Sequence, residues 1–259
     1  MNMKNIENGF VAVFDILGYK SLIENNLLIK TASLVSEFIE KIPLLTKKSL
    51  ASKFEEEKFA KVDDTINDLL KTFIISDTIV VCLPFDFDKI HDDFYKKATT
   101  MYFFSYIASL LRLSCDEGLP MRGGVDHGEF YTTFKSIAGK PFLNAFNLSE
   151  DLEFVGCALT DKAVSELSKI ALIDKKGGLY NNLLFEYLAP LKNKREEKHY
   201  LLHWFYPYKD SGIANPTDVK QYLVDSFHAH AKDVSRNVYP KIENTEIILR
   251  YALTKAWQS

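Results

Sequence analysis

Two aspartates at the ends of apolar runs are the residues whose positions suggest chemistry most directly. Asp15 ends the run 10–14, and Asp77 lies in a polar turn between the apolar segments 71–75 and 78–84. A carboxylate is costly to bury as an anion unless a cation meets it. Two carboxylates presented by neighbouring strands could hold a divalent metal and, through that metal, a triphosphate. Each also has a structural interpretation, as a helix N-cap for Asp15 and as a hairpin turn for Asp77.

The strands that would position these aspartates follow from the spacing of the apolar residues. We predict strands at 10–15, at two segments of 71–84 around the Ser76-Asp77 turn, at 121–132 and at 155–160, with helices at 20–48, 90–115, 139–153 and 161–168. This order begins strand, helix, strand, strand, helix, strand, unlike the regular alternation of a doubly wound sheet. A βαββαβ core places the first strand beside the first hairpin, so Asp15 and Asp77 should lie close together.

The remaining sequence predicts further strands and two C-terminal helices. We expect strands at 187–191 and 200–204 with the charged segment 192–198 between them, a Lys-Lys-Gly-Gly turn at 175–178, a loop at 207–216, and helices from 217 to about 237 and after Pro240. The charged segment 49–68 should be a solvated helix or loop. We expect a core domain over residues 1–206 and a helical extension over 207–259 that packs on the core or on a dimer.

The composition indicates a folded globular protein and favours neither a nucleic-acid-binding nor a membrane protein. The chain has 259 residues, of which 47% are hydrophobic, and a formal net charge of -3. It can therefore bury a large core, and its charge gives no support for a nucleic-acid surface. Cys82, Cys115 and Cys157 lie in apolar runs without metal-ligand spacing, so we expect buried, reduced thiols. With no signal peptide and no apolar span of ~20 residues, we expect a cytoplasmic protein without a membrane partner.

The predicted strand at 121–132 is rich in glycine, with Gly123, Gly124 and Gly128. Glycine in a strand suggests a bulge or the close approach of another backbone or a ligand. Asp126 and His127 are consecutive in this strand, so alternation should place one of them in solvent.

Four short motifs occur in order over residues 10–168: Phe14-Asp15-Ile16-Leu17-Gly18-Tyr19, Ser76-Asp77, Arg122-Gly-Gly-Val-Asp-His-Gly128 and Gly139-Lys-Pro-Phe-Leu-Asn-Ala145. They resemble, in turn, the Phe-x-Asp-Ile-x-Gly-Phe motif, the Gly-Asp turn, the Arg-x-Gly-Ile-x-x-Gly strand and the Gly-x-x-Val-Asn-x-Ala helix start of class III nucleotidyl cyclases. The resemblance implies an α+β fold with a ferredoxin-like βαββαβ, palm-type core, extended by C-terminal strands and helices.

The resemblance also implies an enzyme, a phosphorus-oxygen lyase. Its active sites would lie at the interface of a head-to-tail homodimer, where Asp15, the backbone carbonyl of Ile16 and Asp77 bind two divalent metals, Mg²⁺ or Mn²⁺. One metal would lower the pKa of the ribose 3′-hydroxyl, and the other would hold the triphosphate. The 3′-oxygen then attacks the α-phosphorus and pyrophosphate leaves. Backbone N–H groups around Gly18 and Tyr19 could hold phosphate oxygens.

The chain departs from the family where the base and the transition state are bound. Purine-specific members carry a Lys four residues before the second metal aspartate, where this chain has Phe73, and their base-reading Asp aligns with Ser136. The usual transition-state Asn and Arg align with Leu143 and Asn147. An amide supplies no positive charge, so catalysis through Asn147 needs another cation. Arg122 could be that cation or a triphosphate contact, or it could form a structural ion pair at the start of its strand.

These departures leave several functions open. The chain is similar in size to the divergent bacterial cyclases of the Pycsar type, which make cyclic UMP or cyclic CMP in anti-phage signalling. We therefore predict a nucleotide cyclase acting on UTP or CTP. The alternatives are a catalytically degenerate nucleotide-binding regulatory module and an adenylate or guanylate cyclase with unusual base recognition. A polymerase palm or diguanylate cyclase would carry an adjacent acidic pair at the hairpin turn or a Gly-Gly-Asp-Glu-Phe motif, and this chain has neither a second acid beside Asp77 nor that motif.

Overall fold

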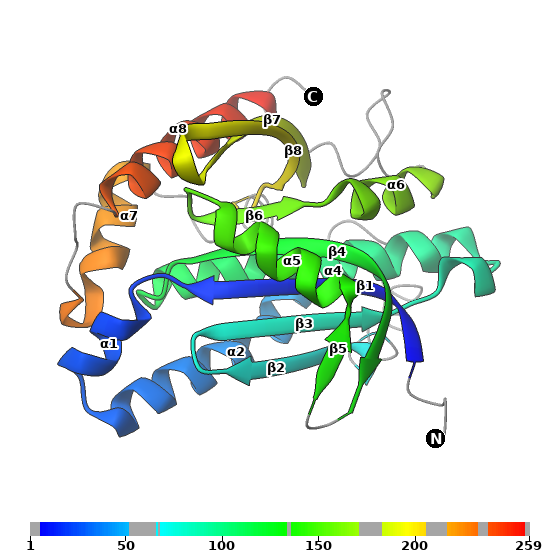
Figure 1. Cartoon of the computed structure of the whole chain (residues 1–259), viewed down its shortest axis with the longest axis horizontal. Helices are drawn as coiled ribbons and strands as arrows, with labels where there is room; N and C mark the ends of the chain where they lie inside the picture. Colours follow the sequence, from blue (N-terminus) through cyan, green and yellow to red (C-terminus); the bar gives the residue numbers. More distant parts are fainter. Residues whose placement is uncertain are drawn as a thin grey trace.

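One mixed sheet organises the part of the chain that the structure describes (Figure 1). The computed structural model describes residues 6–51, 66, 68–133, 136–170, 183–205, 217–232 and 238–256. The strands are β1 Ile6–Ile16, β2 Lys71–Ile75, β3 Thr78–Pro84, β4 Met121–Thr132, β5 Ile137–Gly139, β6 Gly156–Leu159, β7 Leu184–Leu191 and β8 Arg195–Leu202. The helices are α1 Tyr19–Asn25, α2 Leu28–Ala51, α4 Asp93–Asp116, α5 Lys140–Asp151, α6 Asp161–Lys169, α7 Val219–His228 and α8 Tyr239–Ala256.

The first four strands and the helices between them form the predicted core. The sheet order is β2-β3-β1-β4-β6-β8-β7, and β5 pairs with β4 beside this path. β1 pairs antiparallel with β3 and β4, and β3 pairs antiparallel with β2. This is the strand order of a ferredoxin-like βαββαβ sheet, so the predicted α+β class is confirmed. In this register Asp15 lies opposite Thr78 of β3 and Arg122 of β4.

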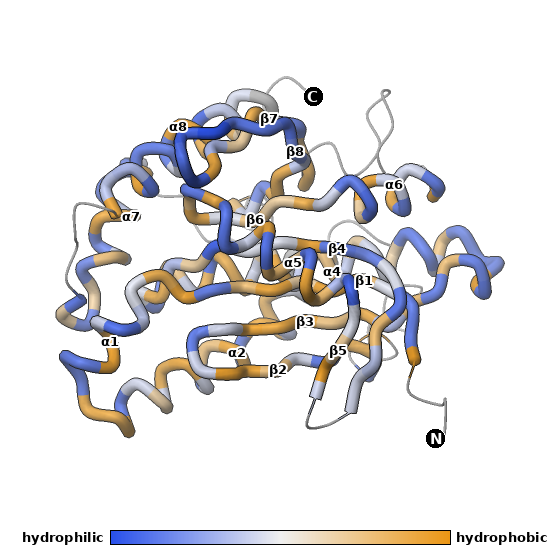
Figure 2. Tube along the Cα trace, viewed as in Figure 1, coloured by the Kyte–Doolittle hydropathy of each residue, from blue (hydrophilic) through white to orange (hydrophobic). Residues whose placement is uncertain are grey.

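Alternating side chains of β1 face opposite sides of the sheet. Phe10 and Phe14 face the large apolar core that includes α2 and α4, whereas Val11 and Val13 face α5. Figure 2 shows the hydrophobic stretches along β1 and β3 that supply these layers. Each large apolar side chain buried in this way contributes about 1.5–3 kcal/mol. Asp15 continues the series of Val11 and Val13, so its side chain points to the α5 side.

A glycine of β4 lets α5 lie close to the sheet. A Cβ built at Gly124 would be 2.3 Å from the backbone oxygen of Ala145 in α5, a distance that no side chain can occupy. The close approach that the glycine-rich strand predicts is therefore made by the α5 backbone.

The prediction that either Asp126 or His127 lies in solvent is wrong, because both faces of β4 are covered. Asp126 is 1% exposed and His127 is 3% exposed. Asp126 accepts hydrogen bonds from Asn144 of α5, at 2.9 Å, and from Thr160. His127 points to the opposite face, where its ring lies 4.9 Å from that of Phe10.

The predicted helix 20–48 is two helices. α1 ends before Asn26, whose extended backbone (φ -132°, ψ 158°) interrupts the helix. The Asn26 side-chain amide donates to the carbonyls of Leu22 and His230, so a contact with a distant segment stabilises the break. Pro43 lies inside α2, which continues to Ala51.

Three further features of the secondary structure differ from the prediction. The charged segment 192–198 is not a connection throughout, because β8 begins at Arg195 and its first residues are exposed strand. The helix predicted from 217 to 237 ends at His228, since the next turn contains His230 with a φ of 60°. β5 was not predicted, and its residues 137–139 pair with the end of β4.

Side chains of the two C-terminal helices pack in buried apolar clusters together with side chains of the sheet. Leu223 and Phe227 of α7 belong to the large core, and Ile248 of α8 packs in a cluster with Phe185 of β7. No helix within the described residues is both long and apolar enough to cross a membrane. The predicted turn at 175–178, the loop at 207–216 and most of the charged segment 49–68 lie outside the described residues.

The three cysteines are buried and form no disulfide, as the sequence predicts. Burial raises the pKa of Cys82 and of Cys115 to about 12, and it also raises the pKa of Cys157. These groups therefore remain thiols at neutral pH, where only a thiolate would be a good nucleophile or metal ligand.

His203 is expected to make the protein less stable in mild acid. The side chain is 3% exposed, and burial lowers its pKa from 6.5 to about 4. The unfolded chain therefore binds the proton more readily, so stability is full above pH 6.5 and falls as the pH drops toward 4, by about 3 kcal/mol. Urea denaturation at pH 7 and pH 4.5 should show a smaller difference for His203→Gln than for the parent. His228→Gln, at an exposed histidine, should retain the parent's pH dependence, and the same result for His203→Gln would contradict the assignment.

Candidate active site

The structure brings the turns that carry Asp15 and Asp77 together at one end of the β1–β3 pair. The Ile16 backbone N–H donates to the Asp77 carbonyl oxygen at 2.9 Å, and the Leu17 N–H donates to the Pro120 oxygen at 2.8 Å. Ser76 begins the hairpin turn with a φ of 60°. The first bond fixes the end of β1 against the β2–β3 hairpin, which is the arrangement that the βαββαβ order predicts for the two aspartates, and the second fixes the chain after β1 to the residue before β4.

Both positive and negative neighbours act on the carboxyl group of Asp15. Burial raises the pKa of Asp15, the guanidinium of Arg122 opposes that rise, and the negative charges of Glu150 and Asp77 add to it. The Arg122 Nε donates to Asp15 Oδ2 at 3.1 Å. One carboxylate oxygen is thus paired, and the charge of Asp77 is close enough to act on the same carboxyl group.

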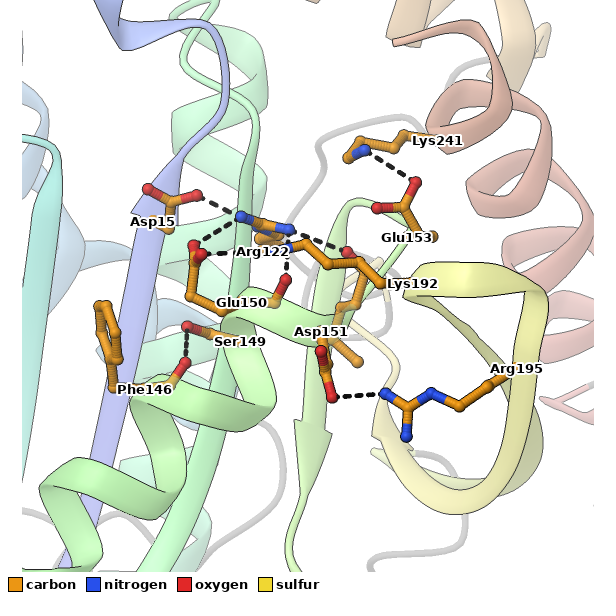
Figure 3. Close-up of polar contacts among 11 residues, drawn as sticks. Asp15, Arg122, Phe146, Ser149, Glu150, Asp151, Glu153, Lys192, Arg195 and Lys241 are labelled. Carbon is orange, nitrogen blue, oxygen red and sulfur yellow. Dashed lines mark hydrogen bonds and ion pairs between the residues drawn. The ribbon is translucent and has the colours of Figure 1, made fainter. Parts of the chain in front are cut away.

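Arg122 is buried, and each of its three side-chain nitrogens donates to a protein group (Figure 3). Besides Asp15, its Nη1 donates to the backbone oxygens of Glu150 at 2.8 Å and Leu152 at 3.2 Å. Its Nη2 donates to Glu150 Oε1 at 2.6 Å. The guanidinium therefore ties β1 and β4 to the C-terminal end of α5, which corresponds to the structural ion pair among the interpretations of Arg122.

The donor set at this end of the sheet fits a hard divalent cation. Asp15 and Asp77 offer carboxylate oxygens, and Ile16 offers its backbone carbonyl, all of them oxygen ligands of the kind that Mg²⁺ prefers. In the described ranges no group of three or more His, Cys, Asp and Glu side chains could hold a metal by itself. A metal here would therefore complete its coordination with water or substrate oxygens, as Mg²⁺ does with phosphates.

Gly18 turns the chain from β1 into α1. It has a φ of 78°, a conformation that favours glycine, and it is the N-cap residue of α1 without a side-chain cap. A Cβ on Gly18 would lie 3.6 Å from the side chain of Lys232, whose ammonium donates to the Gly118 carbonyl. Tyr19 begins α1, a helix of only 7 residues. The side chain of a buried lysine from the C-terminal region therefore lies beside this turn.

The two predicted base-reading residues come from different elements. Phe73 lies in β2, and Ser136 directly precedes β5. Phe73 lines a cavity of about 430 Å³ together with Lys71, Thr72 and Thr133. Ser136 is exposed, and its hydroxyl lies 2.9 Å from that of Thr133. The structure therefore connects both predicted base-reading positions through Thr133.

Lys71 is a residue of this cavity that the motif comparison missed. It lies two residues before Phe73, so both side chains project from the same face of β2. Its ammonium contacts Glu7 at 2.6 Å and Thr132 at 2.8 Å. Period-two spacing from Phe73 was the signal in the sequence that could have identified it.

Leu143 and Asn147 project from the exposed side of α5. They lie four residues apart and so share one face of the helix, where Leu143 is 55% exposed and Asn147 is also exposed. The amide of Asn144, next to Leu143, is committed to Asp126. Within one chain, neither predicted transition-state position is brought to Asp15.

The known proteins that this chain resembles are only distantly similar to it in structure. No protein family and no curated protein matches the chain. The guanylate cyclase domain of RhGC from Catenaria anguillulae, in complex with GTP, aligns with 10% identity over 76% of this chain and 96% of its own, with a TM-score of 0.44. The monomeric guanylyl cyclase domain of the RhoGC fusion protein from Blastocladiella emersonii aligns with 9% identity over 77% and 96%, with a TM-score of 0.44. The catalytic core of a rhodopsin-guanylyl cyclase with converted specificity, in complex with ATPαS, aligns with 10% identity over 77% and 97%, with a TM-score of 0.45. Likenesses this distant carry no conclusion about the chemistry of this chain.

Proposed function

We propose that the chain is a nucleotide cyclase, which converts a nucleoside triphosphate into a 3′,5′-cyclic nucleotide and pyrophosphate. The observation that carries this proposal is the joining of the Asp15 and Asp77 turns by the Ile16–Asp77 backbone hydrogen bond. The motifs around both aspartates, which resemble those of class III nucleotidyl cyclases, support the same reaction.

Asp15, Asp77 and the Ile16 carbonyl would hold two divalent ions, Mg²⁺ or Mn²⁺. When bound, these ions would lower the pKa of the ribose 3′-hydroxyl and neutralise the triphosphate. The N–H groups at Gly18 and Tyr19 would bind phosphate oxygens. In the reaction, the 3′-oxygen loses its proton and bonds to the α-phosphorus, while the bond from that phosphorus to the leaving pyrophosphate oxygen breaks.

In this proposal Arg122 positions Asp15 rather than contacting the triphosphate, because each of its three nitrogens already donates to a protein acceptor. Asn147 would offer a hydrogen bond to the transition state from the partner copy of a dimer. Since an amide has no charge, the metal ions would have to meet most of the developing negative charge.

We propose a pyrimidine triphosphate, UTP or CTP, as the substrate. Phe73 would stack on the base, and the Ser136 and Thr133 hydroxyls would offer hydrogen bonds to its edge. A pyrimidine is small enough to leave room beside an aromatic ring where purine-specific enzymes place a lysine. Cyclic UMP or cyclic CMP would then be the product, a cytoplasmic signal of the kind made in anti-phage defence.

The site would be completed in a head-to-tail homodimer. Exposed apolar side chains lie on the elements around it, with Ile75 of β2 58% exposed and Leu143 of α5 55% exposed. In the proposed dimer these side chains would be covered by the partner copy. The dimer would bring Asn147 of one copy toward Asp15 of the other. Residues 1–206 would form the catalytic domain, and 207–259 an extension that packs on it.

One observation favours a second function, a nucleotide-binding module without turnover. Leu143 occupies the position of a transition-state amide, and an exposed leucine can neither donate a hydrogen bond nor carry charge. Such a module would bind a nucleoside triphosphate and regulate a partner without releasing pyrophosphate.

The two functions are separated by one experiment. The protein is incubated with ATP, GTP, UTP and CTP in separate reactions with Mn²⁺, and cyclic products are sought by mass spectrometry while light scattering measures the oligomeric state. We expect a cyclic pyrimidine nucleotide and pyrophosphate. A dimer that makes no cyclic product from any of the four triphosphates would exclude the enzyme and leave the module.

A further inference from the structure

A second cavity, beside the candidate active site, is lined by more cationic than anionic side chains. It has a volume of about 640 Å³ and lies between the β7–β8 turn and the start of α8. Its charged lining residues are the cations Lys192, Lys194, Arg195 and Lys241 and the acids Glu153 and Glu196. Small-molecule sites of proteins typically have about this volume. We call it the cationic cavity.

The cations of this cavity differ in how firmly they are paired. Lys241 binds Glu153 at 2.9 Å and Arg195 binds Asp151 at 2.7 Å (Figure 3). Lys194 is exposed and has no acidic partner within the described part of the chain. It is therefore the cation that an incoming anion meets without displacing a carboxylate. Leu191 adds an apolar wall.

The cationic cavity is connected to Asp15 by a continuous row of ion pairs. Lys192 Nζ lies 3.4 Å from Glu150 Oε2, and Glu150 Oε1 lies 2.6 Å from Arg122 Nη2. Arg122 Nε in turn lies 3.1 Å from Asp15 Oδ2. Figure 3 shows the side chains of Lys192, Glu150, Arg122 and Asp15 joined in this order, and Lys192 is the one that lines the cavity. We call this row the ion-pair relay.

We propose that the cationic cavity binds a phosphorylated small molecule and that the ion-pair relay reports its presence to Asp15. A phosphate group would be met first by Lys194, the lining cation without an acidic partner among the described residues, and the apolar wall suits an uncharged remainder of the ligand. The relay part of the inference rests on the proposed metal site, whereas the binding part does not.

Whether an anion in the cavity strengthens or weakens metal binding by Asp15 depends on Glu150, which two cations share. Its carboxylate is divided between Lys192 and Arg122. An anion in the cavity attracts Lys192, so the charge of Glu150 then acts on Arg122 alone. Arg122 is held more strongly by Glu150 and less by Asp15, which leaves the Asp15 carboxylate freer to bind a metal.

Binding is tested by calorimetry on the full chain, with inorganic phosphate as the probe and EDTA present to keep the metal site empty. Lys194→Ala should weaken phosphate binding about tenfold, because it removes the unpaired charged donor. Lys198→Ala is the matched control, since this β8 lysine pairs with Glu186 and does not line the cavity. Absence of phosphate binding, or equal affinities in the two variants, would overturn the proposed cavity site.

The relay is tested by the Mn²⁺ affinity with and without sulfate, a dianion that leaves Mn²⁺ in solution, using free Mn²⁺ measured by electron paramagnetic resonance at constant ionic strength. Sulfate should increase the affinity about threefold in the parent and leave Glu150→Gln unchanged. An affinity that sulfate does not change in the parent would overturn the relay. Absence of Mn²⁺ binding altogether would overturn the metal site of the proposed function as well, while the calorimetric result for phosphate would stand.

Discussion

Asp77→Asn is expected to lower the rate of cyclic nucleotide formation about a thousandfold and to leave the free energy of unfolding within about 0.5 kcal/mol of the parent value. Among the described residues, the Asp77 carboxylate makes no hydrogen bond or ion pair, and the side chain is only partly buried. The carboxylate therefore contributes little to folding. Its charge is needed when a divalent ion and a triphosphate are bound, and an amide of the same shape is a much poorer ligand for that ion.

The measurement combines product formation with stability. Cyclic product is quantified by mass spectrometry at saturating Mn²⁺, and unfolding is followed in urea. Asp161→Asn is the matched control, because this exposed aspartate opens α6 far from Asp77 in the sheet order. It should retain activity. An Asp77→Asn variant as active as this control would show that Asp77 is not a metal ligand, while equal loss in both would point to a general effect on the fold.

The placement of the two aspartates could be predicted from the sequence, because that placement depends on the topology of the sheet alone. Apolar periodicity defines the strands, and the βαββαβ order then requires β1 to pair with β3, which brings Asp15 to Thr78 and the turn at Asp77. The buried cysteines followed in the same way, from residues that can only be accommodated in a core.

Other features depend on contacts between distant segments, which periodicity does not encode. Asn26 breaks a helix that its neighbours favour because its amide binds the backbone of His230, 204 residues away. Glu150 was not predicted as a site residue, because its role depends on where α5 ends relative to Arg122 of β4. The exposed start of β8 also lacks apolar alternation, so its charged residues suggested a connection.

Arg122→Met is expected to destabilise the protein by about 3–5 kcal/mol, the largest loss of stability that we expect from one substitution. Arg122 is 7% exposed and donates to Asp15, to Glu150 and to two backbone carbonyls. Methionine fills much of the volume but satisfies none of these acceptors. Two carboxylates and two carbonyls then lose a charged donor, and leaving buried acceptors unpaired costs far more than losing an exposed ion pair.

Urea denaturation compares this variant with Arg250→Met, which removes an exposed arginine paired with Glu246 on α8. The control should change stability by no more than about 1 kcal/mol. A small loss of stability in Arg122→Met, together with a large loss of turnover, would instead indicate that Arg122 contacts the triphosphate.

Arg122→Met also tests whether Arg122 and a metal ion compete for the Asp15 carboxylate. If Arg122 and a metal share this carboxylate, Arg122→Met is less stable without metal yet gains more stability from Mn²⁺ than the parent does, because the released carboxylate binds the ion. Adding Asp15→Asn should recover part of the lost stability, since it neutralises the unpaired charge, and should abolish the extra gain from Mn²⁺. An equal gain from Mn²⁺ in the parent, in Arg122→Met and in the double variant would mean that the ion binds elsewhere and that Arg122 and Asp15 form a structural pair alone.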